Sequence, residues 1–112
     1  MQGFDYLDKD MGLEYCAFDD EIYVEVLQGY VEDDRRADVE KAYNESDWGL
    51  YRTLVHGIKS TSLTIGAPDL SAKAKALEMA AASSDEGFIK ANHQDMMNDY
   101  ADLLGKLAAD LA

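Results

Sequence analysis

Apolar residues recur every three or four positions along most of the chain, which is the spacing of one buried face of an α-helix. The pattern predicts a weakly marked short helix near the N-terminus and four longer helices after it. Their predicted ranges are 9–16, 19–43, 48–64, 68–82 and 86–111. Four consecutive charged residues, Asp33-Asp34-Arg35-Arg36, interrupt the first long helix, and we expect a kink or a break there.

Residues at the predicted helix ends support these boundaries. Ser46 or Asp47 is suited to cap the helix that follows it, and Gly66 stands where a helix commonly ends in a left-handed residue. Pro68 suits the first turn of the next helix. Amphipathic helices joined by short loops pack naturally as an antiparallel bundle. We therefore predict an all-α fold, an antiparallel four-helix bundle with a short extra N-terminal helix, as a single domain over residues 1–112.

The acidity of the chain argues against two classes of partner. Its formal net charge is −13, so the phosphate backbone of a nucleic acid and an anionic membrane surface would both repel it. No stretch approaches the roughly 18 apolar residues of a membrane span, and the first ten residues do not resemble a secretory signal. The only cysteine, Cys16, cannot form an intramolecular disulfide. We expect a cytoplasmic protein that binds neither nucleic acid nor membrane.

Other classes of site lack their motifs. Metal sites in helical bundles use Glu-x-x-His, but Thr53 and Lys90 stand three residues before His56 and His93. Cys16 and two scattered histidines make a poor zinc set. The chain has neither a Gly-x-Ser-x-Gly nucleophile motif nor a phosphate-binding loop. We expect no metal site and no bound cofactor.

The helix predicted over residues 48–64 carries the strongest candidate for function. Residues along a helix are about 100° apart, so four of its residues and the one that follows it form one stripe that we assign to the core. They are Leu50, Leu54, Ile58, Thr61 and Ile65. His56 projects almost opposite this stripe, and on spacing alone an ordinary solvated histidine is the alternative. His93, four residues after Ile89, is expected to be a half-buried packing residue.

Three residues share the outward face with His56, namely Lys59, Ser60 and Leu63. A phosphoryl acceptor must be accessible and neutral near pH 7. The outward position predicted for His56 gives access, and imidazole, with an ordinary pKa of about 6.5, is mostly neutral at that pH. Lys59 is placed to stabilise phosphoryl oxygens. Gly57 and Ser60 are small enough to admit the backbone of a partner, and Leu63 is a candidate apolar contact.

The local charge agrees with a phosphoryl acceptor. Residues 50–77 contain four basic side chains and a single acid, Asp69. The bases are Arg52, Lys59, Lys73 and Lys75. A positive field suits a phosphoryl group, which brings about two negative charges. Chance and ordinary helix solvation are the alternative explanation for so few charges.

A set of short segments between Asp47 and Glu78 has a distinctive spacing. They are Asp47-Trp48, Val55-His56-Gly57-Ile58-Lys59-Ser60, Ile65-Gly66-Ala67, Leu70-Ser71, Ala74 and Leu77-Glu78. Together they resemble the signature of histidine phosphotransfer domains, while the flanking helices match in pattern and length only. Ser60 replaces the family's usual glycine, and Gly57 replaces its usual serine or threonine. Losing the hydroxyl beside His56 leaves open what sets its tautomer.

The resemblance implies a four-helix bundle and reversible phosphoryl transfer between His56 and the aspartate of a response-regulator receiver domain. Lys59 would be the electrostatic helper and Ser60 part of the docking face, with Gly57 and Leu63. The protein would be a monomeric phosphoryl carrier without kinase activity, and its partners would be receiver domains, a hybrid histidine kinase, or both. The receiver would supply Mg²⁺. The alternatives are a helical adaptor that docks receivers without phosphorylation, and the phosphoacceptor domain of a chemotaxis-type kinase.

Overall fold

The computed structural model describes residues 3–112, which contain six α-helices. In chain order they are α1 (Lys9–Tyr15), α2 (Asp20–Glu32), α3 (Arg36–Asn44), α4 (Trp48–Thr64), α5 (Pro68–Ala82) and α6 (Glu86–Leu111). No residue from 3 to 112 lies in a β-strand, so the predicted all-α fold is confirmed. None of these six helices combines the length and the apolar character needed to cross a membrane.

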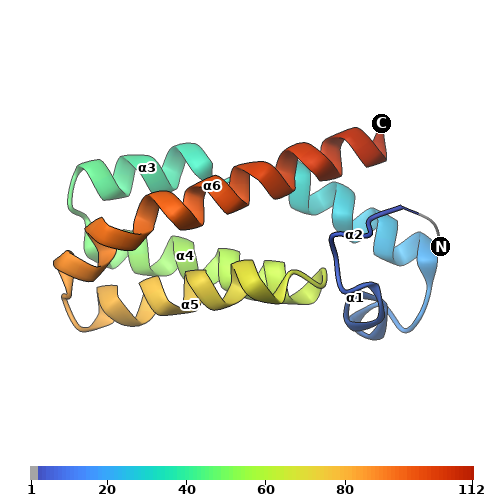
Figure 1. Ribbon diagram of the computed structural model, residues 1–112, viewed down its shortest axis with the longest axis horizontal. Helices are drawn as coiled ribbons and strands as arrows, with labels where there is room; N and C mark the ends of the chain where they lie inside the picture. Colours follow the sequence, from blue (N-terminus) through green and yellow to red (C-terminus); the bar gives the residue numbers. More distant parts are fainter. Residues whose placement is uncertain (1–2) are drawn as a thin grey trace.

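The long helices α4, α5 and α6 follow the long axis of a molecule that measures 41 × 23 × 18 Å, whereas α1 does not (Figure 1). α4 packs most extensively against α5, and α5 packs in turn against α6. Figure 1 shows that the chain reverses direction from α4 to α5 and again from α5 to α6. α3 lies against α4 and α2 against α6, so α2 and α3 together extend along the length of the molecule (Figure 1).

The helix predicted over residues 19–43 is two helices, because the charged run breaks it. Asp34 Oδ1 accepts a hydrogen bond from the backbone N–H of Arg36 at 3.0 Å. The hydroxyl of Tyr100, on α6, accepts one from the backbone N–H of Arg35 at 3.1 Å. Side-chain partners of this kind offer the backbone an alternative to continuing a helix. The outcome is a break rather than a kink, with Arg35 held in the connection between α2 and α3.

Local chemistry fixes both ends of α4. Asp47, rather than Ser46, is the N-cap, and its Oδ1 accepts from the N–H of Leu50 at 3.2 Å. At the other end Gly66 has a φ of +89°, a left-handed conformation that favours glycine. A Cβ at Gly66 would collide with the backbone oxygen of Asp8, whose N–H donates to the Gly66 carbonyl at 2.7 Å. This turn therefore admits only glycine.

The core is dominated by large side chains on the inner faces of the helices. The largest fully buried ones are Tyr23, Tyr51, Tyr100, Leu27, Ile58, Ile65, Leu77, Ile89, Met96, Leu107, Val39 and Val55. The buried tyrosine hydroxyls keep hydrogen-bond partners, as buried polar groups generally do. Tyr23, for example, donates to the carbonyl of Ile65 at 2.6 Å and so ties α2 to the end of α4.

The buried face of α4 is confirmed in part, because Leu54, Ile58 and Ile65 of the predicted stripe are buried, but it is shifted around the helix. Tyr51 and Val55 are fully buried, although neither belongs to the predicted stripe. Leu50 and Thr61, which do belong to it, are exposed, so their assignment to the core is wrong. The reason is that α4 packs against α3 as well as α5, and these two neighbours decide which face is covered. His56 remains on the outward side of the helix.

Candidate functional site

His56 lies midway along α4 with 56% of its side chain exposed, in the outward position that the helical spacing predicted. Its Nδ1 atom lies 2.9 Å from Oε1 of Glu78, on the neighbouring helix α5. The two helices pack closely and run in opposite directions, which brings these residues together although 22 positions separate them in the chain. The imidazole is therefore held at one ring nitrogen and open to solvent elsewhere.

Glu78 joins His56 to Lys59 in one polar cluster. The Lys59 ammonium forms an ion pair with Glu78, 3.0 Å from Oε2. Burial by itself raises the pKa of Glu78, but the interactions with Lys59 and His56 outweigh it and hold the pKa below its ordinary value. Glu78 is therefore a carboxylate at neutral pH.

The contact with Glu78 decides which nitrogen of His56 is free to react. A carboxylate can only accept hydrogen bonds, so Nδ1 must carry the proton that it shares with Glu78. Within residues 3–112, Nε2 has no hydrogen-bond partner, and in the neutral ring it keeps its lone pair. Glu78 thus sets the tautomer that the glycine at position 57 could not set.

The other predicted site residues lie around the same turn of α4. Ser60 is exposed, Gly57 is half-buried, and the side chain of Leu63 is 37% exposed. Leu63 shares a shallow hollow with Met11 and Tyr15 from α1. The apolar part of this face is therefore larger than α4 alone indicated.

The basic stretch around His56 is only partly gathered at the site. Lys59 is beside His56, and Arg52 lines the same shallow hollow as His56 and Glu78. Lys73 instead points to α6, where it pairs with two aspartates, Asp95 at 2.9 Å and Asp99. The expectation that all four basic side chains give a positive field at His56 is therefore wrong for Lys73, because α5 directs this side chain toward α6.

His93 is not half-buried but almost completely buried, with 2% of its surface exposed. Its Nδ1 lies 2.9 Å from the Tyr51 hydroxyl and its Nε2 lies 3.0 Å from Glu40 Oε1. The ring stacks on Tyr43 with 3.9 Å between centroids. Both nitrogens are occupied and the ring is covered, so this histidine is a structural residue and a poor phosphoacceptor.

Two residues of the site had no role assigned from the sequence. Glu78 was part of the recognised spacing, but nothing in the sequence places its carboxylate on His56. Arg35 lies in the connection from α2 to α3, and its guanidinium covers Gly57, such that a Cβ there would stand 3.2 Å from Nη1. Both contacts arise from the packing of separate helices, which spacing along one helix does not reveal.

No group of three His, Cys, Asp or Glu side chains within residues 3–112 is placed to hold a metal ion. Comparisons of the chain with protein-family models, with curated proteins and with solved structures found no match. The geometry described above therefore carries the functional argument.

Proposed function

We propose that this protein is a histidine phosphotransfer protein that accepts a phosphoryl group on His56 from a receiver-domain aspartate and passes it on. The observation that carries the proposal is the exposed imidazole whose Nδ1 is bound by Glu78 while Nε2 is free. The alternating directions of the long helices support an antiparallel four-helix bundle, in which α2 and α3 share one position and α1 is extra (Figure 1). The proposed protein is a cytoplasmic monomer without kinase activity.

The proposed step needs only groups that are already in place. The Nε2 lone pair attacks the phosphorus of an aspartyl phosphate, and the P–O bond breaks with its electrons leaving on the aspartate carboxylate. The ring gains positive charge as the N–P bond forms, and the Glu78 carboxylate at Nδ1 stabilises that charge. Lys59 lies one turn along α4 and offers its charge to the phosphoryl oxygens. Mg²⁺ bound to the receiver would neutralise the same oxygens from the other side.

The surface around His56 fits the approach of a folded partner. Ser60 is small and exposed one turn after His56, and Leu63 adds an apolar contact one turn further. Gly57 adds no side chain of its own, but the Arg35 guanidinium covers that flank of the helix, so the open approach lies over Ser60. An in-line attack requires this open access, because the attacking and leaving atoms must lie on opposite sides of the phosphorus.

Phosphoryl transfer from labelled receivers tests the proposal. Candidate receiver domains from the same organism are phosphorylated with ³²P-labelled acetyl phosphate, freed of the donor and mixed with the protein. Wild type and a folded His93→Gln variant should take up label that survives base and is lost in acid, as phosphohistidine is, whereas His56→Gln should take up none. Label retained by His56→Gln would refute the assignment. Stable binding without label would favour the adaptor, and label only from a kinase with ATP would favour the chemotaxis-type alternative.

A further inference from the structure

A glycine inside a helix is costly, and the packing around Gly57 gives a reason for it. An ideal Cβ at Gly57 would lie 3.2 Å from Arg35 Nη1 and 3.8 Å from Arg35 Cζ. At Gly29 and Gly105, by contrast, a Cβ would meet nothing within 4 Å. The absence of a side chain at Gly57 therefore lets the Arg35 guanidinium lie directly on the backbone of α4.

Arg35 is held firmly but only along one edge. Its Nε and Nη2 atoms both donate to Asp33 Oδ2, at 3.1 and 2.9 Å. Its backbone N–H is fixed by the Tyr100 hydroxyl. Nη1 has no hydrogen-bond partner within residues 3–112, and 37% of the side chain is exposed. An arginine anchored in this way offers a preorganised fork to an oxygen ligand.

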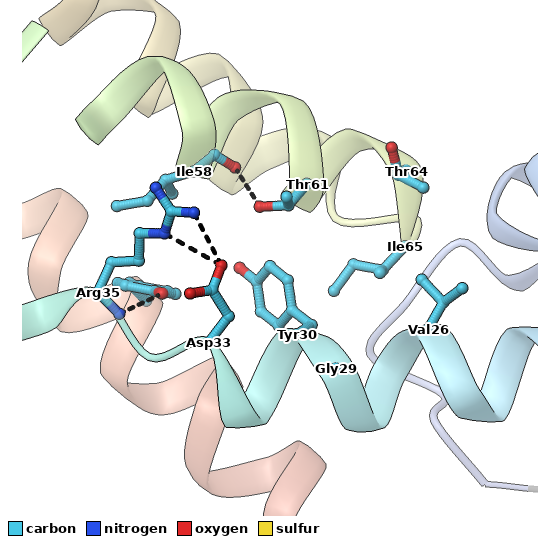
Figure 2. Close-up of a pocket in the computed structure, with 10 residues that line it drawn as sticks. Val26, Gly29, Tyr30, Asp33, Arg35, Ile58, Thr61, Thr64 and Ile65 are labelled. Carbon is cyan, nitrogen blue, oxygen red and sulfur yellow. Dashed lines mark hydrogen bonds and ion pairs between the residues drawn. The ribbon is translucent and has the colours of Figure 1, made fainter. Parts of the chain in front are cut away.

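The space beside Arg35 is open. A hollow of about 240 Å³ lies between α2 and α4 and is lined mainly by apolar groups. Figure 2 shows Arg35 and Asp33 at one end of it, with Ile58 and Tyr30 next to them. A side chain that reaches Arg35 from outside can lay its apolar stem in this hollow.

Arg35 and Glu78 lie on opposite flanks of the His56 turn. Glu78 binds His56 and Lys59, which draws the imidazole toward α5. Arg35 covers Gly57, which is rotated about 100° around the helix from His56, away from Lys59. Arg35 therefore lies on the flank of the His56 turn that is away from Lys59 and Glu78.

We propose, on the basis of the proposed function, that Arg35 is a docking residue that binds a carboxylate of the receiver domain, and that Gly57 is the clearance it needs. A domain that presents an aspartyl phosphate is acidic at that site, and this chain is itself acidic with a net charge of −13. Asp33 balances the charge of Arg35, so the guanidinium contributes chiefly the donors of its remaining edge, which can bind a carboxylate of the partner and orient it.

A double-mutant cycle tests this role. Transfer rates are measured against the concentration of the phosphorylated receiver for wild type, Arg35→Gln, Gly57→Ala and the double variant. Arg35→Gln should raise the half-saturating receiver concentration about three- to tenfold with little change in the maximal rate, because a rim charge affects encounter more than chemistry. Gly57→Ala should raise it similarly by displacing the guanidinium, and the double variant should be no worse than Arg35→Gln. Circular dichroism and melting confirm that each variant is folded.

Arg36→Gln is the matched control. Arg36 is the next residue and, like Arg35, donates through Nε and Nη2 to the carboxylate two residues before it, that of Asp34, but among the described residues it is not one that a Cβ at Gly57 would meet. The substitution Arg36→Gln removes the same charge as Arg35→Gln and should leave the half-saturating receiver concentration within about twofold of the wild-type value. Equal effects of Arg35→Gln and Arg36→Gln would overturn the inference, because only net charge would then matter.

Two further outcomes separate this inference from the proposed function. Hydrolysis of isolated phosphorylated protein should be the same for wild type and Arg35→Gln, and a change there would place Arg35 on the phosphoryl group instead of the partner. If wild type accepts label and Arg35→Gln has the same half-saturating receiver concentration as wild type, the docking role is overturned while the proposed function stands. Failure of wild type to accept label from any receiver would overturn the proposed function and this inference with it.

Discussion

The two histidines show how neighbouring groups decide the chemistry of one residue type. Among the residues from 3 to 112, His56 has one hydrogen-bond partner, Glu78, which holds one ring nitrogen and leaves the other free. His93 has both nitrogens bonded and its ring stacked, so nothing is left for chemistry. A nucleophile needs an accessible lone pair, and only the first arrangement provides one. Burial and hydrogen bonding, rather than residue identity, distinguish the two.

Glu78 is expected to affect transfer and the pH dependence of stability. Glu78→Gln keeps an acceptor for Nδ1 but removes the charge, so the transfer rate should fall about tenfold. The pKa of folded Glu78 lies below its ordinary 4.5, so the ionised group contributes stability that is present above that value and lost as pH falls through the folded pKa. The gap in unfolding free energy between wild type and Glu78→Gln should therefore narrow on acidification from pH 7 to 3. A constant gap would contradict this assignment.

Lys59 is expected to assist transfer without holding the fold. Lys59→Ala removes a partly exposed ion pair, so the free energy of unfolding should change by no more than about 1 kcal/mol. The transfer rate should fall about tenfold, because a cation near the phosphoryl oxygens is lost. Lys106→Ala is the control for loss of a lysine ion pair away from His56, since Lys106 pairs with Asp102 within α6 in a more exposed position. Rapid-quench rates that are equal for the two variants would show that Lys59 is an ordinary surface residue.

At the scale of the helices, local signals predicted the ends of α4 well and its buried face only in part, since Leu54, Ile58 and Ile65 are buried but Leu50 and Thr61 are not. The cap Asp47, the turn at Gly66 and Pro68 at the first position of α5 act within a few residues of themselves, so the sequence predicts them well. The buried face of α4 depends on two neighbouring helices. Apolar spacing therefore pointed to Leu50, whereas packing buries Tyr51.

Two glycines, one within α6 and one in the turn after α4, test how backbone conformation affects the stability of the helices. At Gly105 on α6 an added Cβ meets nothing within 4 Å, so Gly105→Ala should stabilise the protein by about 0.5–1 kcal/mol through helix propensity. Gly66→Ala should destabilise it by more than about 1 kcal/mol, because its φ is +89° and the Asp8 backbone fills the space. Urea unfolding measures both. Equal changes at the two positions would contradict the backbone argument.

At the scale of the whole molecule, the site depends on contacts between distant segments. His56, Lys59, Ser60 and Leu63 lie on one helix, and their common face follows from spacing alone. Glu78 reaches His56 only because α5 folds back along α4, and two residues 22 positions apart carry no signal of that register. The all-α fold and the outward position of His56 were therefore predictable, whereas its contact with Glu78 was not.

The buried contacts of His93 join α3, α4 and α6, so removing one of them should lower the free energy of unfolding of the whole molecule. The Glu40 carboxylate, from α3, accepts from Nε2–H of His93 on α6, so Nδ1 accepts from the hydroxyl of Tyr51 on α4. Tyr51→Phe leaves Nδ1 buried without a donor, which should cost about 1–3 kcal/mol. Tyr15→Phe, at a side chain that is 60% exposed, should cost nothing measurable.

The helices in which amide-exchange protection falls show whether the His93 contacts link three helices or hold only one of them. If His93 links the helices, Tyr51→Phe should lower amide-exchange protection in α3, α4 and α6 by a similar free energy, because these helices would then unfold as one cooperative unit. Loss confined to α3 would mean that the contacts only pin that helix to the rest. Transfer to His56 should stay at the wild-type rate wherever the protein remains folded, because His56 lies on the outward side of α4 whereas Tyr51 is buried in the core. The stability of the fold and the chemistry of the site are thus expected to separate in one variant.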